Sequence, residues 1–103
     1  EVMENIANLE INKSNSYAYL DADKISFPMV FRTWEQGDYF QPLGMKGKKK
    51  VSDFLIDAKV SMVDKQAVKV LVLNNEIVWL VGYRISDKYK ITTLTKRALI
   101  LKK

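Results

Sequence analysis

The sequence predicts a small α+β domain that is mostly β, built as an antiparallel or mixed sheet, or a barrel-like domain, with one main helix. Turn-forming residues recur at short intervals along the chain, which is typical of β domains. The longest apolar runs are rich in β-branched residues. Apolar residues follow a helical period clearly in only one stretch, at about residues 52–62.

Size and composition indicate one domain, over residues 1–103, that lacks the usual catalytic side chains. The chain is 48% hydrophobic and 28% charged, which favours a folded, soluble domain without a membrane span. It has no Cys and no His, which excludes disulfides, thiolate metal sites and imidazole bases. Composition leaves carboxylate, lysine or tyrosine catalysis and a domain that only binds. We expect a domain that only binds, with no catalytic residue, metal site or cofactor in this chain. The absence of an export signal predicts a cytoplasmic location.

The first third of the chain predicts three strands. Residues 6–11 and 17–20 flank a polar turn and could pair as a hairpin, and residues 21–24 form the next turn. Residues 29–34 alternate between apolar and polar side chains up to a turn at 35–38.

The helix is predicted to begin after Ser52, which is a good N-cap residue. Leu55 and Met62 share one helical face, together with the apolar residues at 51 and 58. Val51, just before the cap, is expected to pack on Ile56 as a hydrophobic staple.

The strongest hairpin signal lies in the second half of the chain. Residues 68–73 and 76–85 are β-rich runs separated only by Asn74 and Asn75, and asparagine tolerates the positive φ that a tight turn requires. Both runs are almost continuously apolar, so we expect a hairpin buried on two faces, with Gly82 at a bulge or a close backbone approach. Two short strands, 89–92 and 97–101, are expected to follow around a turn at 93–96, and the last two lysines are expected to fray.

The two halves of the chain carry opposite charge. Of the net charge of +5, residues 1–45 contribute −4 and residues 46–103 contribute +9. A basic half of this kind suits a polyanionic partner such as a nucleic acid, because lysines that neutralise phosphates release counterions. The alternative is that the lysines only keep a small domain soluble.

A glycine-rich basic loop precedes the helix, with the sequence GDYFQPLGMKGKKKVSD. Gly37, Gly44 and Gly47 are expected to shape this loop by adopting positive φ and by letting its backbone approach an anion closely. Its spacing does not match a Walker phosphate loop. A solvated loop with glycines at ordinary turns is the alternative.

A second basic cluster lies at the far end of the hairpin and beyond it. It consists of Arg84, Lys88, Lys90, Lys96 and Arg97. If the sheet brings this cluster beside the loop, the two form one continuous patch. Tyr39 and Tyr89 are candidates for stacking on bases, whereas Trp79 lies in the most apolar strand and is expected in the core.

Three acidic residues near the loop could in principle work as acid and base. They are Asp38, Asp53 and Asp57. We interpret them as structural, because the two on the helix suit its dipole and its solvent face, and Asp38 suits a turn.

Two segments, FRTWEQGDYFQPLGMKGKKKVSDFLIDAKV and EIVWLVGYRI, resemble the C-terminal domain of bacterial tRNA(Ile)-lysidine synthetase. The family pattern is an Arg in a strand, Gly-Asp, an aromatic, Pro, two spaced glycines, Lys-Lys, Ser-Asp and a helix, then Ile-x-Trp and Gly-x-Arg-Ile. The matching positions are Arg32, Gly37, Asp38, Phe40, Pro42, Gly44, Gly47, Lys49, Lys50, Ser52, Asp53, Ile77, Trp79, Gly82, Arg84 and Ile85. The chain departs from the pattern at residues 61–67, where many members have a Pro and an Arg.

The resemblance implies a fragment of a longer enzyme. In that family an N-terminal domain uses ATP, with Mg, to attach lysine to the wobble cytidine of an isoleucine tRNA with a CAU anticodon. The C-terminal domain is similar to one in the phenylalanyl-tRNA synthetase β subunit and helps to bind the tRNA body, most plausibly the acceptor stem. The Ser-Gly-Gly-x-Asp-Ser loop of the catalytic domain is absent from this sequence, so the chain alone should be inactive.

Nine basic residues are the expected tRNA phosphate contacts. They are Arg32, Lys46, Lys48, Lys49, Lys50, Arg84, Lys88, Lys90 and Arg97. Arg32 could instead form a structural pair with Asp38 or Asp53. The alternative functions are a protein-interaction or homodimerisation domain without RNA contact and, less favoured, a self-sufficient enzyme.

Overall fold

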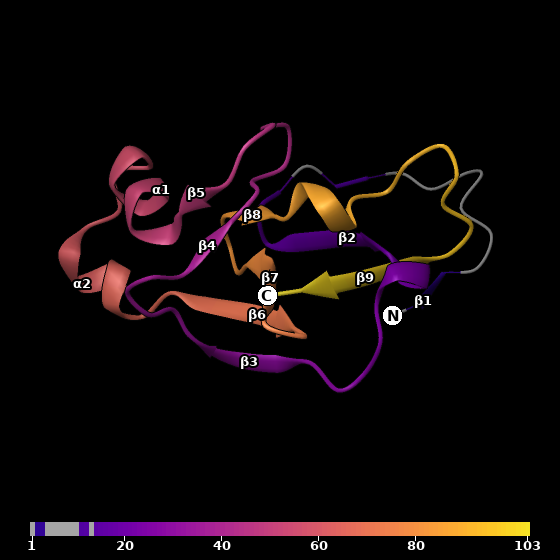
Figure 1. Ribbon diagram of the computed structural model, residues 1–103, viewed down its shortest axis with the longest axis horizontal. Coiled ribbons are helices and arrows are strands. Elements are labelled where there is room, and N and C mark those ends of the chain that lie inside the picture. The colour runs from indigo at the N-terminus through magenta and orange to yellow at the C-terminus, as the bar shows by residue number, and fades with distance from the viewer. Residues whose placement is uncertain (1, 4–10, 13) are drawn as a thin grey trace.

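The computed structural model describes residues 2–3, 11–12 and 14–103 (Figure 1). Two short α-helices and two 3-10 helices, η1 and η2, lie among the strands of this part of the chain. The elements are, in order, β1 (Val2–Met3), β2 (Tyr17–Asp21), η1 (Ala22–Lys24), β3 (Val30–Thr33), β4 (Tyr39–Phe40), β5 (Lys49–Lys50), α1 (Val51–Asp57), α2 (Met62–Gln66), β6 (Lys69–Leu73), β7 (Glu76–Leu80), β8 (Arg84–Ile85), η2 (Asp87–Tyr89) and β9 (Ala98–Lys102). The strand expected over residues 6–11 lies outside the described residues except for Ile11, which is not in a strand.

The described strands form three antiparallel sheets. Their orders are β1-β9-β2, β3-β6-β7-β8 and β4-β5. Figure 1 shows α1, α2 and the β4–β5 pair gathered towards one end of the long axis, with β3 along one edge. The predicted class, a mostly β domain with one main helix, is confirmed, with open sheets rather than a barrel.

The central hairpin confirms the strongest prediction from the sequence. Asn74 and Asn75 join β6 to β7 with φ angles of 49° and 66°. Both faces of β7 are buried, because its side chains enter two separate core clusters. Val78 and Trp79 pack in the cluster with β2 and β9, whereas Leu80 packs in the cluster with α1. The hairpin therefore holds the two halves of the core together.

The chain after this hairpin differs from the prediction. The run 76–85 is interrupted by a turn at Gly82, where φ is 84°, and β8 folds back on β7. A 3-10 helix, η2, replaces the start of the expected strand over 89–92, because the side chain of Ser86 accepts a hydrogen bond from the Lys88 amide and begins a helical turn. Lys102 does not fray, since it pairs with Tyr17 at the end of β9.

The helix prediction is correct in place and wrong in extent. Helix α1 begins at Val51 rather than after Ser52. The Val51 amide donates a hydrogen bond to the backbone oxygen of Asp38 at 2.9 Å, so the start of the helix needs no side-chain cap. It ends before Lys59, whose φ of 58° breaks the helix, so Met62 belongs to α2 and is exposed. The expected staple between Val51 and Ile56 is absent, since Ile56 is exposed and Val51 is part of the helix.

Candidate nucleic-acid interface

The glycine-rich loop between β4 and β5 docks on the segment that contains β8 and η2. The Leu43 amide donates to the Ile85 oxygen at 3.0 Å, and the Asp87 amide donates to the Gln41 oxygen at 2.7 Å. The Gly44 amide donates to Asp87 Oδ1 at 3.0 Å. These bonds bring together two basic segments that lie about forty residues apart in the sequence, a meeting that the sequence analysis had left open.

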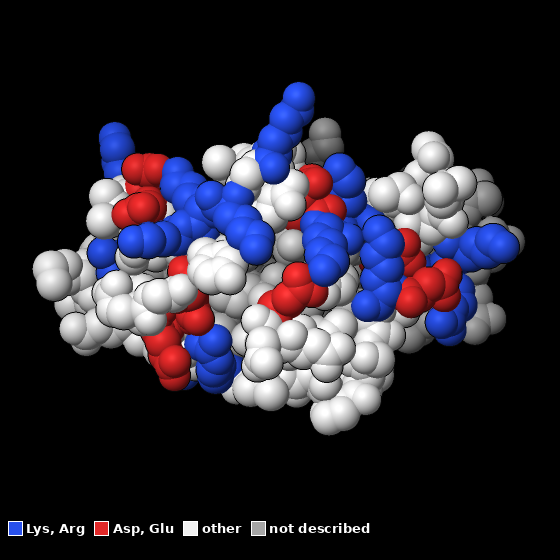
Figure 2. Space-filling view, in the orientation of Figure 1, with Lys and Arg blue, Asp and Glu red and all other residues white. Residues whose placement is uncertain are grey.

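Lysines from both segments form what we call the basic face. It consists of Lys46, Lys48, Lys50, Lys88 and Lys90, joined by Lys24. In Figure 2, Lys and Arg side chains cross the middle of the visible surface as a broken band, interrupted by acidic groups. Among the described residues, Lys46, Lys48 and Lys50 have no ion-pair partner. Their charges are therefore available to an anionic ligand.

Sequence reasoning missed Lys24. This residue ends η1 and donates a hydrogen bond from Nζ to the Lys88 oxygen at 3.3 Å, although the two residues are 64 positions apart. Its local sequence predicts only a turn, so nothing in the sequence signals this contact.

Tyr39 lies on the exposed side of the β4–β5 pair, together with two lysines. Lys50 is its cross-strand partner, and Lys48 Nζ lies 4.9 Å from the centre of its ring. Lys48 therefore lies over the ring, and Lys50 is the neighbour of Tyr39 on the paired strand. The side chain of Tyr39 is 54% exposed and remains a candidate for stacking on a base.

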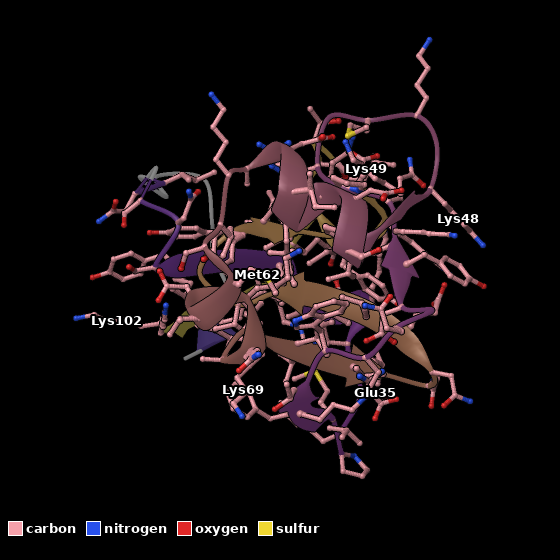
Figure 3. All side chains as sticks on the ribbon, turned by 90° about the vertical axis from the view of Figure 1, so that its left-hand side faces the viewer. Glu35, Lys48, Lys49, Met62, Lys69 and Lys102 are labelled. Carbon is pink, nitrogen blue, oxygen red and sulfur yellow. The ribbon has the colours of Figure 1, made fainter. Side chains whose placement is uncertain are left out.

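Lys49 is held by an acidic partner. Its side chain lies on the opposite side of β5 and forms an ion pair with Asp57 at the end of α1. Lys49 and Lys48 both lie in the upper right part of the view in Figure 3.

Arg32 is also paired. Its Nη1 and Nη2 donate to Asp38 Oδ2 and Oδ1 at 2.9 and 3.0 Å. Burial alone would raise the pKa of Asp38, but hydrogen bonds from Arg32 and from the Glu35 amide, with the charge of Arg32, hold it below its usual value. The pKa of Arg32 is raised by the same hydrogen bond. This arrangement matches the structural role considered for Arg32, and its charge is largely neutralised.

Arg84 and Arg97 make local contacts. The guanidinium of Arg84 lies 5.2 Å from the centre of the Phe54 ring, and Arg97 forms an ion pair with Asp23 at 2.9 Å. Lys96 is exposed beyond the turn at 93–94. None of these three residues has a described hydrogen bond or ion pair to the β4–β5 loop.

The stacking role expected for Tyr89 is wrong. Its side chain is 5% exposed, and its hydroxyl donates to Glu76 Oε1 at 2.7 Å. Burial first, and then Glu76, raises the pKa of Tyr89 to about 12. Glu76 in turn accepts two 2.8 Å bonds from Lys88 Nζ, and the hydrogen bonds from Lys88 and Tyr89 lower its pKa. Tyr89 therefore supports the basic face from within.

Two of the three loop glycines have the expected conformation. Gly37 and Gly44 have φ angles of 92° and 85°, which favour glycine. Gly47 does not adopt a positive φ, and a Cβ added there would meet nothing within 4 Å. The positive φ expected for Gly47 is therefore wrong, whereas the close approach of its backbone to an anion stays a prediction.

A hollow of about 390 Å³ opens beside the basic face between β4 and the start of β7. Its charged and aromatic lining consists of Arg32, Asp38, Tyr39, Phe40, Lys48, Glu76 and Lys88. No local pattern in the sequence predicts this hollow, because residues from five separate segments form it.

The described residues contain no cluster of three or more His, Cys, Asp or Glu side chains suited to a metal ion. Within the same ranges, no helix is long and apolar enough to cross a membrane.

The fold resembles two solved structures. The crystal structure of the TilS C-terminal domain matches with a TM-score of 0.80 at 22% identity, over 98% of this chain and 77% of that chain. An N-terminal fragment of the phenylalanyl-tRNA synthetase β subunit from Pyrococcus horikoshii matches with a TM-score of 0.68 at 24% identity, over 82% of this chain and 26% of that chain. These likenesses bear out the fold that the sequence resemblance implied.

Sequence comparisons assign the family. The tRNA(Ile)-lysidine synthase of Parabacteroides distasonis is 46% identical over 91 residues, which are 88% of this chain and 21% of that protein. The same enzyme of Caldanaerobacter subterraneus is 38% identical over 89% of this chain and 20% of that protein. The chain thus spans about a fifth of the length of these curated relatives. The model of the TilS substrate C-terminal domain matches residues 29–100, and the chain therefore belongs to this family of C-terminal domains of tRNA(Ile)-lysidine synthases.

Proposed function

We propose that this domain binds the tRNA substrate of a tRNA(Ile)-lysidine synthase through its basic face, with phosphates of a duplex stem, the acceptor stem, as ligands. The observation that carries the proposal is the docking of the β4–β5 loop on the segment at 84–90. It holds lysines from two segments on one surface and leaves Lys46, Lys48 and Lys50 without a described acidic partner. Duplex RNA is bound largely through phosphates, 2′-hydroxyls and shape, for which exposed ammonium groups are suited.

Catalysis is proposed to belong to the rest of the parent protein. The acidic residues beside the basic face are already bound by cations: Asp38 by Arg32, Glu76 by Lys88 and Asp87 by Lys90. None of them is placed to act as a free general base. The proposed parent reaction uses ATP with Mg to join lysine to the wobble cytidine of an isoleucine tRNA with a CAU anticodon, in the cytoplasm. We assign no residue of this chain to ATP or Mg.

The test compares two double charge reversals that change the net charge equally. Lys46→Glu with Lys48→Glu alters the basic face. Lys69→Glu with Lys102→Glu alters two lysines that Figure 3 places away from Lys48. In filter binding to an isoleucine tRNA at low salt, the first variant should bind at least tenfold more weakly and the second should bind nearly as well as the wild type. If both variants lose the same affinity for tRNA, binding depends only on the net charge of the domain, and the basic face is not the binding site.

A second candidate function is protein contact, including a homodimer. It is favoured by exposed apolar side chains at and before the edge strand β3, where Phe27, Val30 and Phe31 are 72%, 55% and 61% exposed. Elution that depends on protein concentration, with no retardation of tRNA, would favour this function over RNA binding.

A further inference from the structure

The hollow beside the basic face differs from a surface that only holds phosphates. Its volume of about 390 Å³ lies within the range of small-ligand pockets, which is about 300–1,000 Å³. A base-paired stem cannot enter a space of this size, but one unpaired residue of a strand can. The buried side chain of Ser86 and the β7 residue Ile77 also line it.

The charges around the hollow match a single phosphodiester. Three cations (Arg32, Lys48 and Lys88) and two carboxylates (Asp38 and Glu76) line it, which leaves one net positive charge. A phosphodiester carries one negative charge, whereas a free nucleoside triphosphate carries several and would meet both carboxylates. Lys48 is the cation of the three without a described ion pair, so the phosphate belongs beside it.

The remaining groups suit the base and the ribose of the same residue. Tyr39 contributes an exposed aromatic ring, and stacking on such a ring tolerates any base. Asp38 Oδ2 and Glu76 Oε1 each already accept two hydrogen bonds. Asp38 Oδ1 and Glu76 Oε2 accept one each and keep a further lone pair for an amino group or a 2′-hydroxyl. The hollow therefore offers a cation for the phosphate, a ring for the base and two acceptor oxygens for the base or the ribose.

We propose that this hollow holds one unpaired nucleotide at the end of an RNA duplex, with its base on Tyr39 and its phosphate at Lys48. The inference rests on the proposed function, because the adjoining duplex lies on the basic face. It adds a preference that phosphate binding alone does not give, namely for a duplex end that carries an unpaired nucleotide.

The experiment uses two RNA hairpins with the same stem, one blunt and one with a single unpaired 3′ nucleotide. The wild-type chain should bind the second about tenfold more tightly, as expected for one stacked base. Tyr39→Phe, which keeps the ring, should retain this preference. Tyr39→Leu should lose this preference, because it has no ring on which the unpaired base can stack. With 2-aminopurine as the unpaired base, binding should quench its fluorescence in the wild type and in Tyr39→Phe but not in Tyr39→Leu.

Equal affinity of the wild type for both hairpins, or a preference that survives Tyr39→Leu, would overturn the inference and leave the proposed function intact. Failure to bind either hairpin would instead overturn the proposed function, and the inference with it.

Discussion

The guanidinium of Arg32 is joined to the carboxylate of Asp38 by two parallel hydrogen bonds, of 2.9 and 3.0 Å. The pair connects β3 to the turn before β4, and the backbone oxygen of Asp38 accepts the bond from Val51 that begins α1. One side-chain pair therefore ties the edge strand to the start of the main helix. The Arg and the Gly-Asp of the family pattern meet here as a structural unit.

Replacing Asp38 with Asn should lower the free energy of unfolding by about 1–2 kcal/mol, between the values for surface and buried ion pairs. The cost arises because Arg32 loses a charged acceptor while remaining partly buried. Urea unfolding measures the change. Asp53→Asn is the matched control, since Asp53 is exposed and has no described ion pair, and it should change stability by less than about 0.5 kcal/mol. Equal effects would contradict a specific role for the pair.

The same pair predicts how stability depends on acid. The pKa of Asp38 is lower in the folded chain than its ordinary value of 3.8, so its contribution is fully present above that value. It is lost as the pH falls below 3.8 through the folded pKa, because the unfolded chain then binds the proton more strongly. Glu76 and Asp87 change in the same direction. Unfolding followed from pH 6 to pH 2 should therefore show a smaller loss of stability for Asp38→Asn than for the wild type, and parallel curves would refute the assignment.

Gly44 and Gly47 should respond differently to alanine. Gly44 has a φ of 85°, so Gly44→Ala should cost about 1–2 kcal/mol of stability and should weaken RNA binding by disturbing the loop at its bond to Asp87. Gly47→Ala meets no atom within 4 Å and needs no positive φ, so it should be tolerated. Thermal unfolding and filter binding check both variants, and similar behaviour of the two would contradict the conformation of the loop.

Tyr89 should stabilise the fold without contacting RNA. Tyr89→Phe removes the hydrogen bond to Glu76 and should cost about 1–2 kcal/mol. The pKa of Tyr89 is raised from 10.0 to about 12, so its contribution is present below pH 10 and is lost as the pH rises towards 12. The variant should therefore lose less stability than the wild type over that interval. Tyr39→Phe is the control and should change stability by less than about 0.5 kcal/mol, because its hydroxyl has no described hydrogen bond.

Local signals in the sequence identified the elements whose residues decide their own conformation. Asn74 and Asn75 specify the central turn, and the apolar runs beside them specify two buried strands. The predicted start of the helix was wrong because the Val51 amide donates to the backbone oxygen of Asp38, which is distant in the sequence, and not to a local cap. The prediction of a strand from residue 89 was wrong at its start, because the hydrogen bond from the Lys88 amide to the Ser86 side chain favours a 3-10 turn there.

The candidate site was predictable in its composition and not in its geometry. The sequence shows that lysines are concentrated near the loop, but it does not show which of them have acidic partners. Lys49 and Lys50 are adjacent and identical in the sequence, yet only Lys49 forms an ion pair with Asp57 on α1. Lys24 and Glu76 join the site through contacts between segments distant in the sequence, which no local pattern encodes.

This difference between neighbours gives the sharpest test of phosphate contact. Lys50 is exposed without a described ion pair, whereas Lys49 is bound to Asp57. A lysine that neutralises a phosphate contributes about one unit to the slope of log affinity against log salt. Lys50→Ala should therefore reduce this slope by about one unit. Lys49→Ala, with the same change in net charge, should reduce it by clearly less, because Asp57 already neutralises Lys49.

Filter binding to an isoleucine tRNA between 50 and 200 mM salt, a range over which such contacts change affinity by orders of magnitude, measures both slopes. Asp57→Asn provides the converse experiment, because releasing Lys49 from its partner should steepen the slope of an otherwise unchanged chain. If Lys49→Ala and Lys50→Ala flatten the slope equally, the ion pair with Asp57 does not persist in the complex, and both lysines turn to the RNA.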